Sequence, residues 1–179
     1  IKMQRMKYKL FFLVSAVLLV GCSVQQVQKK NTVITIQKPF DDKAVSWFKN
    51  KGTGRIKGTA KFKSKNGELH FGETFGVELM PACRYTKERL KAIYTHKNSG
   101  FIFLEDGVPK FTPDPEGYHD TKKTICNKEG EFEFDNLPAG EYYVIAFMIW
   151  DNQNTKTGGG IMQRIVLSDT ELREIEMKN

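Results

Sequence analysis

His70 and Glu73 are the first residues in this sequence whose types and spacing could support chemistry. A His-x-x-Glu pair can supply two ligands to a zinc ion. A catalytic zinc site needs three protein ligands and an open fourth position, and the sequence offers no convincing third ligand. The pair also lies at the end of an expected strand. We therefore expect no metal and no catalytic centre here.

Cys22 is the second reactive residue, and the sequence before it indicates a membrane-anchoring reaction. Met6 to Lys9 is short and positive, and Leu10 to Val20 is apolar but too short to span a bilayer. The segment Leu19-Val20-Gly21-Cys22 resembles the lipobox of bacterial lipoproteins. That resemblance implies a diacylglycerol on the thiol and cleavage before Cys22. The alternative is an ordinary signal peptide followed by an unmodified cysteine.

The lipoprotein resemblance also sets the expected organisation of the chain. Residues 1–21 would be a signal peptide, with residues 1–5 as an upstream extension of the reading frame. Residues 22–32 would be the lipidated cysteine and a polar tether with a reach of about 17 Å. Residues 33–179 would form a single domain. Ser23 in place of Asp implies a lipid-anchored protein of the bacterial outer membrane.

The formal net charge of +7 and the pI near 9.2 overstate how basic the mature chain would be. Four of the 28 basic residues and none of the 21 acidic ones precede Cys22, so 24 and 21 remain, a net charge of +3. We therefore expect no nucleic-acid partner. Residues 49–65 hold seven basic residues and no acid. They could meet lipid phosphates, but we favour a solvated sheet face whose lysines protect an edge strand.

Cys83 and Cys126 remain as an even pair once Cys22 carries lipid. In an oxidising compartment such a pair favours a disulfide. The bridge would close a loop of about 44 residues, worth about 4 kcal/mol in the chain-entropy model. Two buried thiols are one alternative. A reactive Cys83 is another, and it would need a base such as His96 or His119.

Strands must position the histidine and cysteine residues described above, and the pattern of apolar residues predicts where these strands lie. Apolar and polar residues alternate from Arg55 to Lys63, and Asn66-Gly67 then predicts a hairpin turn. Glu141 to Trp150 is apolar on both faces, which predicts a central strand covered on two sides. Further strands are expected over residues 33–37, 75–80, 101–104, 121–126, 131–135, 161–167 and 172–177. The segments 127–130 and 151–160 should be turns, the first of them closing a second hairpin.

Two helices are expected among these strands. One, over residues 43–50, would be capped by Asp41 or Asp42. The other, over residues 86–97, could cover the second face of the central strand. Residues 105–120 contain three prolines and no periodicity, which predicts a surface loop. Seven or eight short strands separated by turns favour a β-sandwich.

Leu137-Pro138-Ala139-Gly140-Glu141-Tyr142 reads as a structural turn. Pro138 and Gly140 suit a type I turn, and we expect a positive φ at Gly140. Tyr142 would form a tyrosine corner, in which the phenol bonds back to the backbone of the preceding connection. We expect this turn to fix a crossover between two sheets and to have no role in catalysis.

Three stretches, residues 54–58, 76–81 and 130–142, resemble carboxypeptidase regulatory-like domains. The resemblance covers about residues 54–177. It implies an all-β, transthyretin-like (Ig-like Greek-key) sandwich of about seven strands, with one inserted helix in an insertion over residues 84–125. It also implies a noncatalytic domain, so no catalytic residue and no cofactor are expected.

The insertion contains the residues that we expect to meet a partner. Asp114, Glu116 and Asp120 could hold calcium, but their spacing lacks the EF-hand pattern, and solvated acids are the favoured interpretation. Sandwich loops often carry binding residues. We therefore expect a partner to contact three side chains of this loop: Phe111, Tyr118 and His119.

Together these features predict a noncatalytic envelope lipoprotein whose sandwich is an interaction or structural module. Its partners would be the membrane, through the lipid, and an envelope protein or glycan. One alternative is a docking lipoprotein of an envelope machine, since type VI secretion uses a lipoprotein with a similar sandwich. Another is a carbohydrate- or peptidoglycan-binding module, which would need exposed aromatic residues on one face. An enzyme would need a pocket with clustered polar groups.

Overall fold

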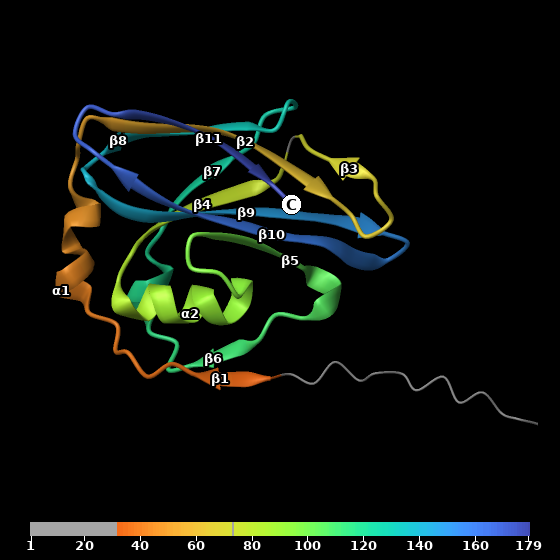
Figure 1. The fold of residues 1–179 in the computed structure, drawn as a ribbon, viewed down its shortest axis with the longest axis horizontal. Coiled ribbons are helices and arrows are strands. Elements are labelled where there is room, and N and C mark those ends of the chain that lie inside the picture. The colour runs from red at the N-terminus through yellow and green to blue at the C-terminus, as the bar shows by residue number, and fades with distance from the viewer. Residues whose placement is uncertain (1–31, 73) are drawn as a thin grey trace, which may run out of the picture.

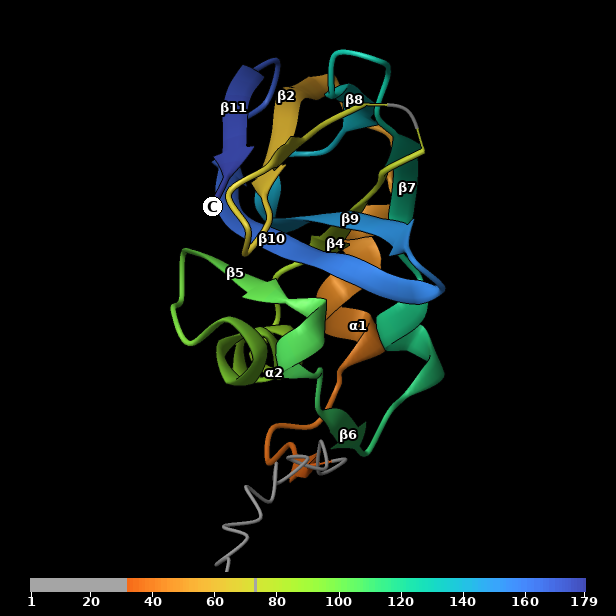
Figure 2. The ribbon, with the colours of Figure 1, turned by 90° about the vertical axis from the view of Figure 1, so that its right-hand side faces the viewer.

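Two β-sheets stack face to face in this protein, and a helical layer covers the outer face of one of them (Figures 1 and 2). The computed structural model describes residues 32–72 and 74–179. Cys22, the leader before it and Glu73 lie outside the described residues. No helix within the described part of the chain is long and apolar enough to cross a membrane.

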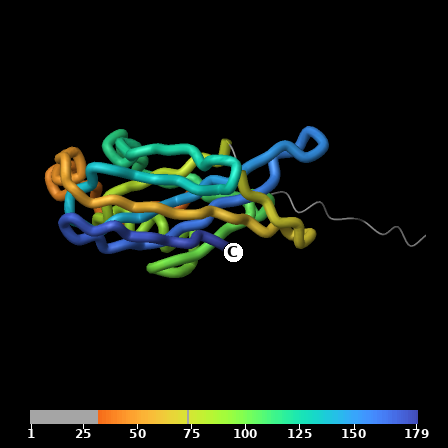
Figure 3. The backbone as a smooth tube through the Cα atoms, turned by 90° about the horizontal axis from the view of Figure 1, so that it is seen from above, coloured from red at the N-terminus to blue at the C-terminus, as the bar shows by residue number. Residues whose placement is uncertain are grey.

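The larger sheet has five antiparallel strands in the order β5-β10-β9-β4-β7. Their bounds are Ser99–Phe103 for β5, Thr155–Leu167 for β10, Gly140–Asn152 for β9, Gly76–Pro81 for β4 and Lys122–Ile125 for β7. β9 lies at the centre. The β9–β10 hairpin reaches the end of the molecule opposite α1 (Figures 1 and 3).

The smaller sheet is built around β2, Gly54–Lys63. β11, Leu172–Lys178, pairs with β2 in parallel, whereas β8, Glu131–Leu137, and the short β3, Leu69–His70, pair with it antiparallel. The residues of β2 that alternate inward, including Ile56, Ala60 and Phe62, are fully buried. The sequence prediction of an all-β sandwich is therefore confirmed.

The main core lies between the two sheets. The even-numbered residues of β9 face it, because successive side chains of a strand point to opposite faces. They pack against the inner residues of β2, β8 and β11. The four residues of β9 that contribute are Tyr142, Val144, Ala146 and Met148.

A second core covers the opposite face of β9, where Tyr143 and Ile145 are buried. Its cover is the helix α2, Arg84–Tyr94, as the sequence predicted. The rest comes from β6 (Lys110–Thr112) and η3 (Glu116–His119), with β1 (Val33–Thr35) paired in parallel to β6. The short helix η2 (Leu104–Asp106) contacts β10. A further short helix, α1 (Asp42–Val45), begins at its cap Asp41 and continues as η1 (Ser46–Lys49).

Two sequence predictions about turns were wrong. β7 and β8 do not form a hairpin, because β7 pairs with β4 in one sheet and β8 with β2 in the other. Residues 127–130 therefore cross between sheets. The segment 151–160 is mostly strand, and only Gln153 and Asn154 form the turn, with φ values of 46° and 67°. Two successive positive φ angles suit the tight turns that join twisted antiparallel strands.

The corner before β9 differs in one respect from the prediction. The Tyr142 hydroxyl donates a hydrogen bond to the carbonyl oxygen of Pro138. Gly140, however, does not have a positive φ, which occurs instead at Asn136, at 57°. A Cβ atom at Gly140 would lie 2.2 Å from atoms of the Trp47 ring. Glycine is needed at Gly140 because the indole of Trp47 occupies the space of a side chain.

The predicted disulfide between Cys83 and Cys126 does not form, and both cysteines are free. The amide of Cys126 donates to the carbonyl oxygen of Phe75, at the start of β4. Cys83 follows the other end of β4, after Pro81. At about 3.3 Å per residue this separates the cysteines by on the order of 20 Å, whereas a disulfide needs α-carbons within about 7 Å. Antiparallel pairing of β4 and β7 thus places them at opposite ends.

Gly140→Ala should lower the free energy of unfolding by about 1–3 kcal/mol, because overpacking against Trp47 forces the ring or the backbone to move. Gly76→Ala is the matched control, since a Cβ there meets no atom within 4 Å. Its effect should stay within about 0.5 kcal/mol. Urea denaturation of the three proteins measures both values. Equal stability of the Gly140→Ala and parent proteins would contradict this account of the corner.

The two thiols should react separately with a thiol reagent. Cys83 is partly exposed, and its sulfur accepts a weak hydrogen bond from the amide of Thr86. Cys126 is 3% exposed, and burial raises the pKa of its thiol. Mass spectrometry after alkylation of the folded protein should find label on Cys83 and little on Cys126 until urea is added. A crosslinked Cys83–Cys126 peptide in non-reducing maps would contradict the structure.

Candidate functional site

A cavity of about 280 Å³ lies between the outer face of the five-stranded sheet and its helical cover. Ile145, Phe147 and Ile149 of β9 line it from the sheet. They are odd-numbered residues, so the alternation that buries the even ones in the sandwich directs these toward α2. Leu90, Ile93 and Tyr94 of α2 form one wall, and residues 108–121 form the other. We call this space the α2 cavity.

Glycines in β10 leave room for a polar group in the α2 cavity. Gly160 lies opposite Phe147 across the β9–β10 pair. A Cβ atom at Gly160 would lie 2.8 Å from the hydroxyl oxygen of Tyr94. Any larger residue at Gly160 would therefore displace that hydroxyl. Glycine at this position leaves space for the Tyr94 phenol in the cavity.

Two tyrosines bring hydroxyl groups to the α2 cavity. Tyr94 is 4% exposed and Tyr118 is 8% exposed. Neither hydroxyl has a hydrogen-bond partner within the part of the chain that the structure describes. Burial raises the pKa of both phenols well above the ordinary value, and in Tyr118 the nearby Arg89 opposes this rise only in part. Both phenols are therefore neutral at physiological pH and can donate and accept hydrogen bonds.

Arg89 of α2 places a fixed cation beside these phenols. Its guanidinium lies 4.3 Å from the ring centre of Tyr118 and 4.5 Å from that of Phe111. Its Nη1 atom donates to the hydroxyl of Tyr85 at 3.0 Å and to the carboxylate of Asp114. Its Nε atom is buried and has no partner among the described residues. Stacking and two hydrogen bonds thus hold the group rigidly.

Asp114 balances the charge of Arg89. His119 Nε2 lies 2.9 Å from the same carboxylate oxygen that meets Arg89. Burial alone would raise the pKa of Asp114, but the hydrogen bonds from Arg89 and His119 outweigh it and lower that pKa. Glu78 and Lys123 form another pair at the rim, 3.3 Å apart.

The three residues expected to meet a partner, Phe111, Tyr118 and His119, all line the α2 cavity. Two of them are not displayed to solvent, however, since Phe111 and Tyr118 are at most 9% exposed. Sequence reasoning missed Arg89 and Tyr94. Arg89 lies four residues after Tyr85, a spacing that places a cation beside an aromatic ring on one face of the helix, but this signal did not reveal what that face contacts.

The other candidate residues form no common site. His70 stacks on the Trp150 ring, with centroids 3.7 Å apart, at the far end of the sandwich. Asp120 pairs with Lys49 at 2.6 Å, and Asp114 pairs with Arg89, so the loop acids do not converge on a cation. No group of three or more His, Cys, Asp or Glu residues among those described could hold a metal ion.

The basic run over residues 49–65 is partly neutralised by ion pairs. Arg55 pairs with Glu133 and Asp135 of the neighbouring strand β8, and Lys65 pairs with Asp106. These pairs are exposed and contribute little stability individually. They nevertheless offset part of the positive charge of this run, which is consistent with a solvated sheet surface.

Comparison with solved structures finds a protein of similar fold. No protein-family model matches this chain, and no curated protein matches it in sequence. A crystal structure from Pseudomonas aeruginosa, described as that of a "putative carbohydrate binding protein", matches with a TM-score of 0.62 and 22% identity. The match covers 79% of this chain and 99% of that one. At this identity the likeness shows the shared fold alone.

Asp114→Asn should destabilise the protein at pH 7 more than at pH 3. The folded-state pKa of Asp114 is lowered, so its ionised form stabilises the fold above the unfolded pKa of about 3.9. That stability is lost as pH falls through the folded pKa. Thermal melts at both pH values measure the difference. Glu116→Gln, a neighbouring exposed acid with no ion pair among the described residues, is the control and should show no such dependence. A pH-independent effect of Asp114→Asn would contradict this role.

Proposed function

We propose that this chain is a noncatalytic carbohydrate-binding module, and that the α2 cavity is its sugar site. The observation that carries this proposal is the pair of hydroxyls on Tyr94 and Tyr118, whose largely buried side chains line one cavity and whose oxygens have no hydrogen-bond partner among the described residues. Each neutral phenol can donate and accept a hydrogen bond, so two of them lining one cavity suit a hydroxylated ligand. Arg89, whose guanidinium lies 4.3 Å from the ring centre of Tyr118, holds a positive charge in the same wall.

The walls of the α2 cavity suit the apolar faces of a sugar ring. A sugar ring presents hydroxyls at its edge and C–H groups on its faces, and the latter pack against apolar and aromatic side chains. Ile93, Ile145 and Phe147 supply such surfaces, and Phe147 is 37% exposed at the opening. Ligand pockets usually measure about 300–1,000 Å³. The cavity, at about 280 Å³, would therefore hold one sugar unit of a chain rather than a long oligosaccharide.

The description of the Pseudomonas aeruginosa structure is compatible with this proposal. Since the likeness extends only to the fold, the cavity chemistry has to support the function by itself.

We also propose that the module is anchored to the bacterial envelope, where it binds glycans near the membrane. This part is supported by the lipobox-like segment before Cys22 and the apolar run Leu10 to Val20.

A docking lipoprotein is the main competing function. Docking through the 105–120 loop would require its large side chains to be available to a protein partner. Phe111 and Tyr118 instead pack against Arg89 and face the α2 cavity. This arrangement favours a small ligand over a protein surface at that loop.

Tyr118→Phe should weaken binding of a sugar identified on a glycan array by about 5- to 30-fold. Loss of one hydrogen bond with a buried group costs on the order of 1–2 kcal/mol, and 1.4 kcal/mol is a factor of ten. Tyr142→Phe is the matched control, because its hydroxyl already bonds to Pro138. It should lower stability slightly and leave affinity unchanged. Isothermal titration calorimetry measures all three proteins. Equal affinities of parent and Tyr118→Phe, or no array binding by the parent, would refute the proposed site.

Cys22→Ala should abolish labelling by a fatty-acid analogue and release the protein from the membrane fraction. Several acyl chains, at about 0.8 kcal/mol per buried methylene, anchor a protein firmly. Cys83→Ala is the control, since that thiol lies in the folded domain. Membrane association of the Cys22→Ala protein equal to that of the parent would contradict lipid anchoring.

A further inference from the structure

A second hollow, of about 530 Å³, lies on the other flank of α2 and is strongly basic. We call it the basic groove. It is bounded by α2, by the connection from α2 to β5, and by β9 and β10. Two-thirds of its lining residues are cations, and they come from four separate parts of the chain: Lys38, Arg84, Lys87, Lys91, Lys97 and Arg164.

The helix supplies half of these cations because of their spacing. Residues three, four or seven apart lie on one face of a helix. Arg84, Lys87 and Lys91 follow this spacing, whereas Arg89 lies on the side that faces the α2 cavity. The two hollows therefore use different faces of α2 and present different chemistry, one aromatic and one cationic.

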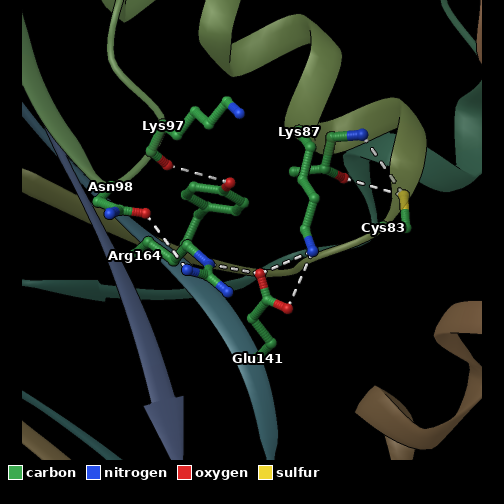
Figure 4. Close-up of polar contacts among 8 residues, drawn as sticks. Cys83, Lys87, Lys97, Asn98, Glu141 and Arg164 are labelled. Carbon is green, nitrogen blue, oxygen red and sulfur yellow. Dashed lines mark hydrogen bonds and ion pairs between the residues drawn. The ribbon is translucent and has the colours of Figure 1, made fainter.

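Two acids beside the basic groove are already engaged. The Glu88 carboxylate accepts hydrogen bonds from the backbone amides of Gln37 and Lys38, both at 2.9 Å. Glu141 pairs with Lys87 at 2.9 Å and with Arg164, which converge on it from α2 and β10 (Figure 4). These contacts lower the pKa of both carboxyls, so both acids are ionised at neutral pH.

Four cations form no ion pair among the described residues: Lys38, Arg84, Lys91 and Lys97, although Glu88 attracts the charge of Lys38. All four are exposed at the surface of the groove. Like charges that line one hollow repel one another. Such an arrangement attracts an anion and raises its local concentration.

Neutral polar groups complete the groove. Asn98 accepts a hydrogen bond from Arg164 at 3.2 Å through its side-chain oxygen. The Tyr143 hydroxyl donates to the carbonyl oxygen of Lys97 at 3.3 Å (Figure 4). These bonds fix the connection between α2 and β5, so the cations are carried by a positioned backbone. The Asn98 amide can also donate to a ligand hydroxyl.

We infer that the basic groove binds an acidic saccharide, one that carries carboxylate or phosphate groups. This inference rests on the proposed carbohydrate-binding function and narrows the class of ligand. The concave shape favours a molecule that enters the groove, and the four separated cations favour a ligand with more than one negative charge. Binding should weaken with added salt, because exposed charges are screened.

The test uses tetragalacturonate and glucose 6-phosphate as acidic probes and maltotetraose as the neutral probe. Calorimetric titrations at about 20 mM and about 500 mM salt span Debye lengths from about 20 to about 4 Å. The groove variant is Arg84→Glu/Lys91→Glu, which removes two unpaired cations. The matched control is Lys51→Glu/Lys63→Glu, two exposed lysines outside the groove with the same change in net charge. Thermal melts verify that both variants fold.

We expect an acidic probe to bind the parent protein at low salt at least tenfold more tightly than it binds the groove variant. The control variant should lose less than about threefold, and high salt should abolish the difference. Equal losses in the two variants would show attraction to net charge alone and overturn the inference. Failure of both acidic probes to bind the parent would also overturn it.

Two further outcomes separate this inference from its rivals. Groove-dependent binding to vesicles containing phosphatidylglycerol, with no binding of either acidic saccharide, would assign the groove to lipid headgroups and contradict the inference. Tyr118→Phe should leave the salt-dependent contribution of the groove unchanged. The groove variant could bind the acidic probes as tightly as the parent does, while Tyr118→Phe loses affinity for a neutral sugar. That result would contradict the groove inference and support the α2 cavity as the sugar site.

Discussion

The strand β9 has to be buried on both faces, and the rest of the structure follows from this constraint. Its even-numbered residues, such as Val144, need the second sheet, and its odd-numbered residues, such as Ile145, need another layer. Fully burying an aliphatic side chain contributes about 1.5–3 kcal/mol, so leaving either face open would cost several times that amount along the strand. The segment between β4 and β7 supplies the missing layer, with α2 at its centre (Figure 2).

A helix laid across a sheet covers it imperfectly, and both proposed sites lie beside α2 for this reason. Tyr85 and Leu90 are fully buried against the sheet. On one flank the space between α2 and residues 108–121 remains as the α2 cavity, with Arg89 at its wall. On the other flank the basic groove presents Arg84 and Lys91. A noncatalytic sandwich can thus acquire binding chemistry through one insertion, without altering its core.

Features set by local periodicity could be predicted from the sequence. The two apolar faces of residues 141–150 predicted the central strand, and the spacing of residues 86–97 predicted the helix that covers it. Features set by the register and pairing of strands could not be predicted from the sequence. Cys83 and Cys126 have a spacing that permits a bridge, but the antiparallel pairing of β4 and β7 separates them. Arg89 was missed because its partners are distant in sequence, and only folding brings Asp114 beside it.

The account depends most on the claim that the face of β9 beneath α2 is where a ligand binds. Backbone amide chemical shifts, recorded while a sugar identified on a glycan array is titrated into the protein, test this claim directly. The account predicts that the largest shifts cluster at Tyr94, Tyr118, Phe147 and Gly160, which meet only at the α2 cavity. Shifts confined to the exposed faces of β2, β8 and β11, with none around α2, would contradict it.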